Sequence, residues 1–184
     1  AVVVGVLMTI KKNDSVVTTY RDHGHMIARG LNPKKIMAEL TGREDGYSAG
    51  KGGSMHMFSK ENNFYGGHGI VGAQVPIGTG IAFTHKYNSD KNICRTYIGD
   101  GAMNNGQVFE AFNLAALWKL PVLYIIENNK YGMGTAVERA AAGSDLYKRG
   151  EAFGIKGEIV DGMNVYSVIK AAEKAGDYVR TGNG

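Results

Sequence analysis

Two spacings of apolar residues alternate along the chain, and they predict helices and strands in turn. Across Gln107–Trp118 the apolar positions, among them Val108 and Phe112, recur at helical spacing and form one wide face. Ile93–Ile98 and Val122–Ile126 flank this segment and are short apolar runs rich in β-branched and aromatic residues. Such runs are typical of buried strands in parallel sheets. The centre of the chain is therefore predicted to be a strand–helix–strand unit.

The same spacings predict further elements on both sides of this unit. Strands are expected at Val16–Tyr20 and Gly157–Val160, and helices at Ala1–Ile10, Asn32–Leu40, Val75–Phe83, Asp145–Phe153 and Val165–Tyr178. The alternation predicts an α/β fold, an open and mainly parallel sheet with helices on both faces. No linker or repeat divides residues 1–184, which we interpret as a single domain truncated at both ends.

One helix start is marked by its residues. Asn32 suits the cap and Pro33 the first position of a helix. In the helix that follows, we expect Ile36, Met37 and Leu40 to face inward, because they recur at helical spacing.

The amino-acid composition limits the classes of protein to which this chain can belong. The chain has 184 residues, enough for one domain with a core, and its hydrophobic content of 43% is ordinary. The formal net charge of +4 comes from scattered Lys and Arg, so no nucleic-acid groove is predicted. No apolar run reaches transmembrane length. The single cysteine, Cys94, lies in a predicted strand and is expected to be buried and inert.

Polar residues follow where the two central strands are expected to end. Asp100 lies between two glycines after the first strand, and Asn129 closes the second. A strand–helix–strand unit brings the ends of its strands to one sheet edge, so the two side chains should emerge side by side. Carboxylate, amide and carbonyl oxygens suit Mg²⁺, which completes its octahedral shell with phosphate oxygens and water. Ordinary turn residues remain the alternative interpretation.

The order of these segments resembles the thiamine-diphosphate motif, in which GDG is followed by a helix, an apolar strand and NN. Here GDG is Gly99–Gly101 and NN is Asn128–Asn129. The flanking segments extend the resemblance over nearly the whole chain. They are YRDHGH (Tyr20–His25), GKGGSMHMF (Gly50–Phe58), NNFYGGHGIVGAQVPIGTGIAF (Asn62–Phe83), ENNKYGMGTAVERAAA (Glu127–Ala142) and VDGMNV (Val160–Val165). Together they resemble alpha subunits of the first component of pyruvate dehydrogenase, a thiamine-dependent decarboxylase.

The resemblance implies a thiamine diphosphate site with Mg²⁺. It implies the metal ligands Asp100 and Asn129, through side chains, and Tyr131, through its carbonyl oxygen. It implies that the diphosphate contacts Tyr20, Arg21 and the backbone of Gly101 and Ala102. It implies that the main chains of Gly69 and Val71 bind the aminopyrimidine.

The resemblance also implies an activity and partners. The expected reaction is oxidative decarboxylation of pyruvate with acetyl transfer to a lipoyl group on an acetyltransferase core, giving acetyl-CoA. A separate beta subunit supplies the activating glutamate, which implies a heterotetramer of two alpha and two beta chains. The family's histidines near the substrate would precede Ala1 and follow Gly184, so we assign no catalytic residue within this chain. Bacterial cytoplasm and mitochondrial matrix are both compatible locations.

Other interpretations stay open. Alpha subunits of acetoin and branched-chain 2-oxo acid dehydrogenases are close alternatives, and a degenerate structural subunit is another. Gly67–Gly72 reads GHGIVG, a literal dinucleotide-binding fingerprint with Asp90 further on, which favours a non-catalytic nucleotide-binding module. That fingerprint requires a preceding strand, and the mostly polar Lys60–Tyr65 predicts none. Gly46–Ser54 imitates a nucleoside-triphosphate loop but fails its spacing. His23 and His25 lack a third ligand for a metal site.

The central motif departs from the family pattern at two positions. The family usually has GDGAANQGQ, whereas this chain has GDGAMNNGQ. Met103 is bulkier than alanine, and Asn105 is shorter than glutamine. Neither is an implied metal ligand, so we expect altered packing and retained binding.

Overall fold

The computed structural model describes residues 1–143 and 145–184. Its main sheet has four parallel strands in the order β2-β1-β3-β4. These strands are β1 (Ser15–Thr19), β2 (Phe64–His68), β3 (Cys94–Gly99) and β4 (Val122–Glu127). A small antiparallel hairpin is formed by β5 (Tyr131–Gly132) and β6 (Thr135–Ala136). The predicted open, parallel sheet is confirmed.

Helices connect these strands. The α-helices are α1 (Val2–Met8), α2 (His23–Arg29), α3 (Pro33–Leu40), α4 (Gln74–Tyr87), α5 (Gly106–Leu117), α6 (Val137–Ala140) and α7 (Val165–Tyr178). Shorter or irregular helical segments are η1 (Lys60–Asn62), η2 (Gly101–Asn104), η3 (Leu146–Phe153) and η4 (Val179–Asn183). Within the described ranges, no helix is long and apolar enough to cross a membrane.

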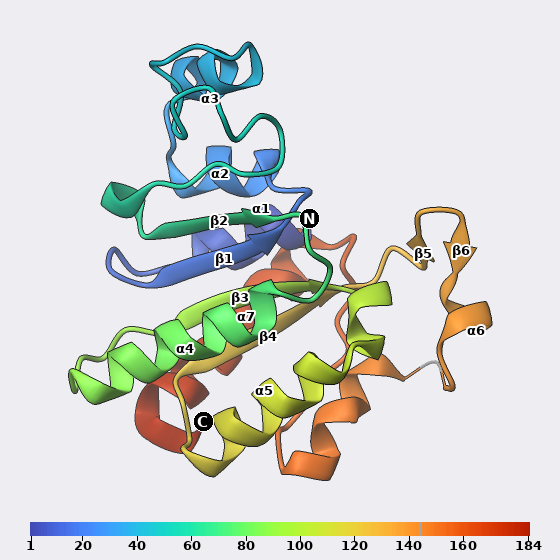
Figure 1. Ribbon diagram of the computed structural model, residues 1–184. Helices are drawn as coiled ribbons and strands as arrows, with labels where there is room; N and C mark the ends of the chain where they lie inside the picture. Colours follow the sequence, from blue (N-terminus) through green and yellow to red (C-terminus); the bar gives the residue numbers. More distant parts are fainter. Residues whose placement is uncertain (144) are drawn as a thin grey trace.

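Helices cover both faces of the sheet, as predicted (Figure 1). Because side chains alternate along a strand, β1 sends Val16 to one face and Val17 to the other. Val16 packs in a cluster with residues of α1, α2 and α7. Val17 packs in a second cluster with α4 and α5. The two apolar clusters hold the sheet between the two helical layers.

Helix α4 lies close to β3 because it presents a glycine to the strand. A Cβ built on Gly78 would collide with the side chain of Thr96. Only glycine lets the helix axis approach the sheet this closely. The approach brings the start of α4 and the end of β3 together at one edge of the sheet.

Strand β2 departs from the sequence-based prediction. No strand was expected before the glycines at 66 and 67, yet Phe64–His68 pairs in parallel with β1. Phe64 is buried, and the ring of Phe58 covers Gly66 where a Cβ would otherwise lie. The apolar cover of this strand therefore comes from another segment, which periodicity within the strand cannot indicate.

Strand β4 is an edge strand, and its residues after Val122 are only half-buried. A cavity of about 1120 Å³ runs along it, between β4, η3 and α7. The prediction of a further strand at Gly157–Val160 is wrong, because this described segment has no ladder partner. An apolar run indicates that a segment packs against other elements, but it does not show that the segment pairs with a neighbouring strand.

Helix α3 buries a charge in place of two apolar residues. Asn32 caps it by accepting a hydrogen bond from Lys34 N at 2.9 Å, as its sequence predicts. Ile36 is buried, but Met37 is 61% exposed and Leu40 is 39% exposed. Glu39 is fully buried instead. Its carboxylate accepts hydrogen bonds from backbone amides of the loop that follows the helix. The apolar spacing within the helix gives no sign of these partners.

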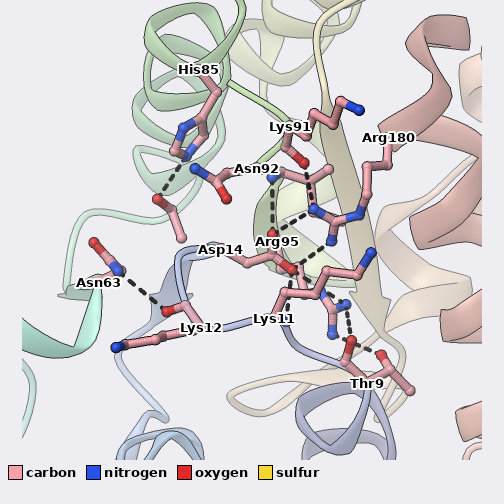
Figure 2. Close-up of polar contacts among 12 residues, drawn as sticks. Thr9, Lys11, Lys12, Asp14, Asn63, His85, Lys91, Asn92, Arg95 and Arg180 are labelled. Carbon is pink, nitrogen blue, oxygen red and sulfur yellow. Dashed lines mark hydrogen bonds and ion pairs between the residues drawn. The ribbon is translucent and has the colours of Figure 1, made fainter. Parts of the chain in front are cut away.

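A buried network of charges lies at the opposite edge, where the strands begin (Figure 2). The carboxylate of Asp14 accepts hydrogen bonds from Arg180 at 3.0 and 2.8 Å and from Ile93 N at 3.1 Å. Arg95 is 1% exposed and donates to the side chain and carbonyl of Thr9, both at 2.8 Å. The network joins the end of α1, the starts of β1 and β3, and η4.

We expect Asp14→Asn to destabilise the fold strongly. The substitution leaves the buried guanidinium of Arg95 and the largely buried one of Arg180 beside a neutral amide, and breaking a buried ion pair costs about 3–5 kcal/mol. Chemical denaturation followed by the fluorescence of the single tryptophan, Trp118, measures the change. Asp161→Asn, at an exposed position, is the matched control. Equal unfolding midpoints for the two variants would contradict a stabilising role for the network.

Candidate functional site

The carboxyl ends of all four parallel strands meet at one edge of the sheet. Connections leave β1 toward β2 on one side and reach β3 on the other, so a topological switch point lies between β1 and β3. Open α/β sheets bind ligands outside this point. The predicted site residues all follow strand ends at this edge: Tyr20, Arg21, Gly69, Val71, Asp100, Gly101, Ala102, Asn129 and Tyr131.

Asp100 follows β3 directly and is 2% exposed. Its Oδ2 atom has no hydrogen-bond partner in the described part of the chain. A buried carboxylate oxygen without a donor is costly unless a cation or ligand supplies the missing interaction. Gly99 pairs with Glu127 across β3 and β4, so Asp100 and the residues after β4 emerge next to each other. This is the juxtaposition that the strand–helix–strand pattern predicts.

Asn129 and Tyr131 form a tight turn after β4. The side-chain Oδ1 of Asn129 accepts a hydrogen bond from Tyr131 N at 3.0 Å. An amide oxygen has two lone pairs, so one remains for another partner. A Cβ built on Gly101 would lie 3.9 Å from Cα of Gly132. The hairpin therefore folds back over the start of η2, beside Asp100.

The end of β1 presents Tyr20 and Arg21. The guanidinium of Arg21 lies 5.7 Å from the centre of the Tyr20 ring, within cation–π range. Arg21 is exposed and forms no ion pair with any described residue. A guanidinium placed this way is available to an anion, whose oxygens it binds with fixed, bidentate geometry.

Asp22 is a buried acid that the sequence analysis did not single out. Both carboxylate oxygens are buried and lack partners within the described ranges. Burial raises the pKa of Asp22 to about 6, although nearby His23, His25 and His56 oppose the rise. The signal available in the sequence was its position between Arg21 and a histidine pair.

The loop between β2 and α4 carries Gly69 and Val71. The carbonyl oxygen of Val71 accepts hydrogen bonds from Asn105 Nδ2 at 3.1 Å and Gln107 Nε2 at 3.2 Å. These contacts tie the loop to the start of α5, so Asn105 keeps a structural contact despite its departure from the family pattern. Met103 is fully buried in the core beside them.

The geometry does not support a dinucleotide site at Gly67–Gly72. In such sites the fingerprint follows a central strand, and the acidic residue also lies at the ligand edge. Here β2 is an edge strand. Asp90 precedes β3 at the opposite edge and pairs with His85 at 3.0 Å. The acidic partner of the fingerprint is therefore far from its glycines.

The histidine pair does not form a metal cluster. Among residues 1–143 and 145–184, no three His, Cys, Asp or Glu side chains gather as metal ligands. His23 contacts the side chain of Ser54 at 2.9 Å. His25 is buried, 3.3 Å from Glu127, and its ring packs edge-on against Tyr97. Both imidazoles thus have contacts of other kinds.

Comparison with protein families gives a match over the whole chain. The model of the dehydrogenase E1 component matches residues 1–184. The chain is 60% identical over 184 residues to the pyruvate dehydrogenase E1 component subunit alpha of Rhizobium meliloti (strain 1021), covering 53% of that protein. It is 56% identical over 184 residues to the mitochondrial subunit alpha of Dictyostelium discoideum, covering 48%. The chain spans about half the length of these relatives.

Two solved structures share the fold at low sequence identity. Benzoylformate decarboxylase from Polynucleobacter necessarius matches with a TM-score of 0.65 and 15% identity, over 97% of this chain and 30% of that one. A putative thiamin diphosphate-dependent enzyme from Mycobacterium smegmatis matches with a TM-score of 0.60 and 16% identity, over 96% and 29%. The sheet and its helical layers are thus an arrangement found in other proteins.

We expect Asp22→Asn to stabilise the fold at neutral and alkaline pH. The folded pKa of about 6 lies above the ordinary 3.8, so ionisation costs stability as the pH rises between these values. One pKa unit corresponds to about 1.4 kcal/mol, which gives a gain of about 1–3 kcal/mol at pH 8. Denaturation at pH 8 and pH 5 measures it, and the gain should shrink at pH 5.

Asp45→Asn, at an exposed position, is the control for removal of one negative charge. A gain from Asp22→Asn that is the same at both pH values would contradict the raised pKa.

Proposed function

Because the chain belongs to the family of dehydrogenase E1 components, we propose that it is the diphosphate-binding part of a thiamine-dependent 2-oxo acid decarboxylase. One observation carries the proposal. Asp100 is buried with an unpartnered carboxylate oxygen, at the sheet edge where parallel α/β folds bind ligands, and next to the turn of Asn129. A bound cation would supply the interaction that this buried oxygen lacks.

The proposed cation is Mg²⁺, held with the diphosphate of the cofactor. Its ligands from this chain are the side chains of Asp100 and Asn129 and the carbonyl oxygen of Tyr131. These three oxygens form half of the octahedral shell that Mg²⁺ prefers, and phosphate oxygens and water complete it. The free lone pair of Asn129 and the unpartnered Oδ2 of Asp100 fit this role.

The remaining predicted residues are assigned to the organic cofactor. Tyr20 and Arg21 contact the diphosphate, and the exposed guanidinium suits this anion. Gly101 and Ala102 present backbone to the same group. The main chains of Gly69 and Val71 hold the aminopyrimidine. When bound, thiamine diphosphate supplies the carbanion chemistry of decarboxylation, and this chain binds and orients it.

The proposed activity of the whole protein is that of a pyruvate dehydrogenase alpha subunit. Relatives named so are 56–60% identical to this chain, which favours pyruvate over the substrates of acetoin and branched-chain dehydrogenases. In this proposal pyruvate is oxidatively decarboxylated and its acetyl group passes to a lipoyl group on the acetyltransferase core. Residues 1–184 act as one domain. A beta subunit completes the site in a heterotetramer of two alpha and two beta chains.

We expect Asp100→Ala to weaken binding of thiamine diphosphate with Mg²⁺ at least about tenfold, because the metal loses a charged ligand. Titration calorimetry of the full-length assembled protein, with Mg²⁺ and then with a chelator, measures the loss. Asp161→Ala removes an exposed carboxylate and is the control. Unchanged affinity in the Asp100 variant would remove the metal assignment.

We expect Arg21→Lys to weaken thiamine diphosphate binding about tenfold, although the charge is kept. An ammonium lacks the fork that binds two phosphate oxygens at once, and a hydrogen bond to a charged group contributes about 1.5–3 kcal/mol. The same calorimetric titration measures the change, with the exposed Arg43→Lys as control. Equal dissociation constants for both variants would contradict a contact between Arg21 and the diphosphate.

A further inference from the structure

The carboxylate of Glu39 is enclosed by backbone amides of the loop after α3. Its Oε2 accepts hydrogen bonds from Ser48 N at 2.8 Å and Gly50 N at 2.9 Å. Its Oε1 accepts from Gly52 N at 2.6 Å and Gly53 N at 3.1 Å. The residue is fully buried. Four donors from one loop therefore converge on one buried charge.

This arrangement explains the glycine-rich run that imitates a phosphate-binding loop. Such runs turn successive amides toward an anion, and here the anion is a side chain of the same chain. A Cβ built on Gly46 would lie 2.6 Å from Cα of Glu39, so glycine is needed for the loop to close on the helix. Desolvation opposes the charge, but the four amides outweigh it and lower the pKa of Glu39. The acid thus stays ionised and keeps the loop closed.

The closed loop sets the position of His56. Ser48 Oγ donates to the carbonyl of His56 at 2.6 Å, and the next residue, Met57, is fully buried. The imidazole Nδ1 lies 3.2 Å from the carbonyl oxygen of Gly67. Two atoms of the ring, Cε1 and Nε2, lie 3.1 and 3.2 Å from a Cβ built on Gly69. The ring thus rests directly against the loop between β2 and α4.

The contact with Gly67 also fixes the chemistry of the ring. A carbonyl oxygen only accepts, so Nδ1 is the donor in this contact, and in the tautomer with its proton on Nδ1 the Nε2 atom is an acceptor. This Nε2 has no hydrogen-bond partner in the described part of the molecule. The acceptor Nε2 therefore lies beside Gly69, where the N–H group of a bound ring could donate a hydrogen bond to it.

We propose that Glu39 is a positioning residue of the cofactor site, and that it acts by holding His56 against Gly69, where the imidazole contacts the bound aminopyrimidine. The inference rests on the proposed function, which places that ring at Gly69 and Val71. It adds two residues, Glu39 and His56, that neither the spacing of motifs nor the family resemblance assigned.

A double-mutant cycle in the full-length assembled protein tests the coupling. We expect Glu39→Gln and His56→Ala each to weaken thiamine diphosphate binding about tenfold, in the range that loss of a supporting hydrogen-bond partner costs. If Glu39 acts through His56, then Glu39→Gln adds little in the His56→Ala background. Calorimetric dissociation constants of the four proteins give the coupling. Additive losses would overturn the proposal, because a purely structural glutamate weakens both backgrounds alike.

Hydrogen exchange without cofactor gives a second readout. We expect Glu39→Gln to speed exchange of the amides of Ser48, Gly50, Gly52 and Gly53 at least about tenfold, since their acceptor loses its charge. His56→Ala should leave these amides protected. Glu44→Gln neutralises an exposed acid nearby and is the control. Unchanged exchange in Glu39→Gln would overturn the positioning role.

The wild-type titration separates the two proposals. If the wild-type assembly does not bind thiamine diphosphate, the proposed function fails and this inference fails with it. If the wild type binds and both single variants bind equally well, only the inference about Glu39 and His56 is overturned.

Discussion

Parallel hydrogen bonding of β1 to both β2 and β3 is the constraint on which the arrangement of the site depends. Because all four strands run in the same direction, their carboxyl ends reach one edge together, and each connection starts there. Residues far apart in sequence, such as Arg21 after β1 and Asp100 after β3, reach the same edge of the sheet through this pairing. The helices on either face hold the strands in register, but they contribute few groups to the edge itself.

Three buried aspartates have carboxylates in three different environments. Asp14, at the starting edge, is neutralised by guanidinium groups and fixes the ends of four elements. Asp100, at the opposite edge, has one carboxylate oxygen without a hydrogen-bond donor in the part of the chain that the structure describes. Asp22 has a raised pKa, and neither of its carboxylate oxygens has a hydrogen-bond donor among residues 1–143 and 145–184. Of these three carboxylates, the one at the starting edge has its donors from the protein, and the two near the ends of the strands have oxygens without described partners, as expected for a binding site.

The regular elements could be predicted from the sequence because their signals are local. The bounds of α7 and the juxtaposition of Asp100 with Asn129 follow from apolar spacing and from the strand–helix–strand rule. Burial of Glu39 could not be predicted, because its partners are backbone amides, which every residue type except proline has. The strand at Phe64–His68 was missed because the side chain that covers its glycine belongs to Phe58. The metal and cofactor assignments came from resemblance and remain predictions.

The unpaired side of β4 has a consequence for handling the protein. Its outer N–H and C=O groups have no ladder partner among the described residues, and apolar Leu123 and Ile125 line the adjoining cavity. An apolar sheet edge of this kind is a template for pairing with another chain and a known route to aggregation. Charged residues at the edge, such as lysine, would hinder such pairing and offer a way to keep these residues in solution.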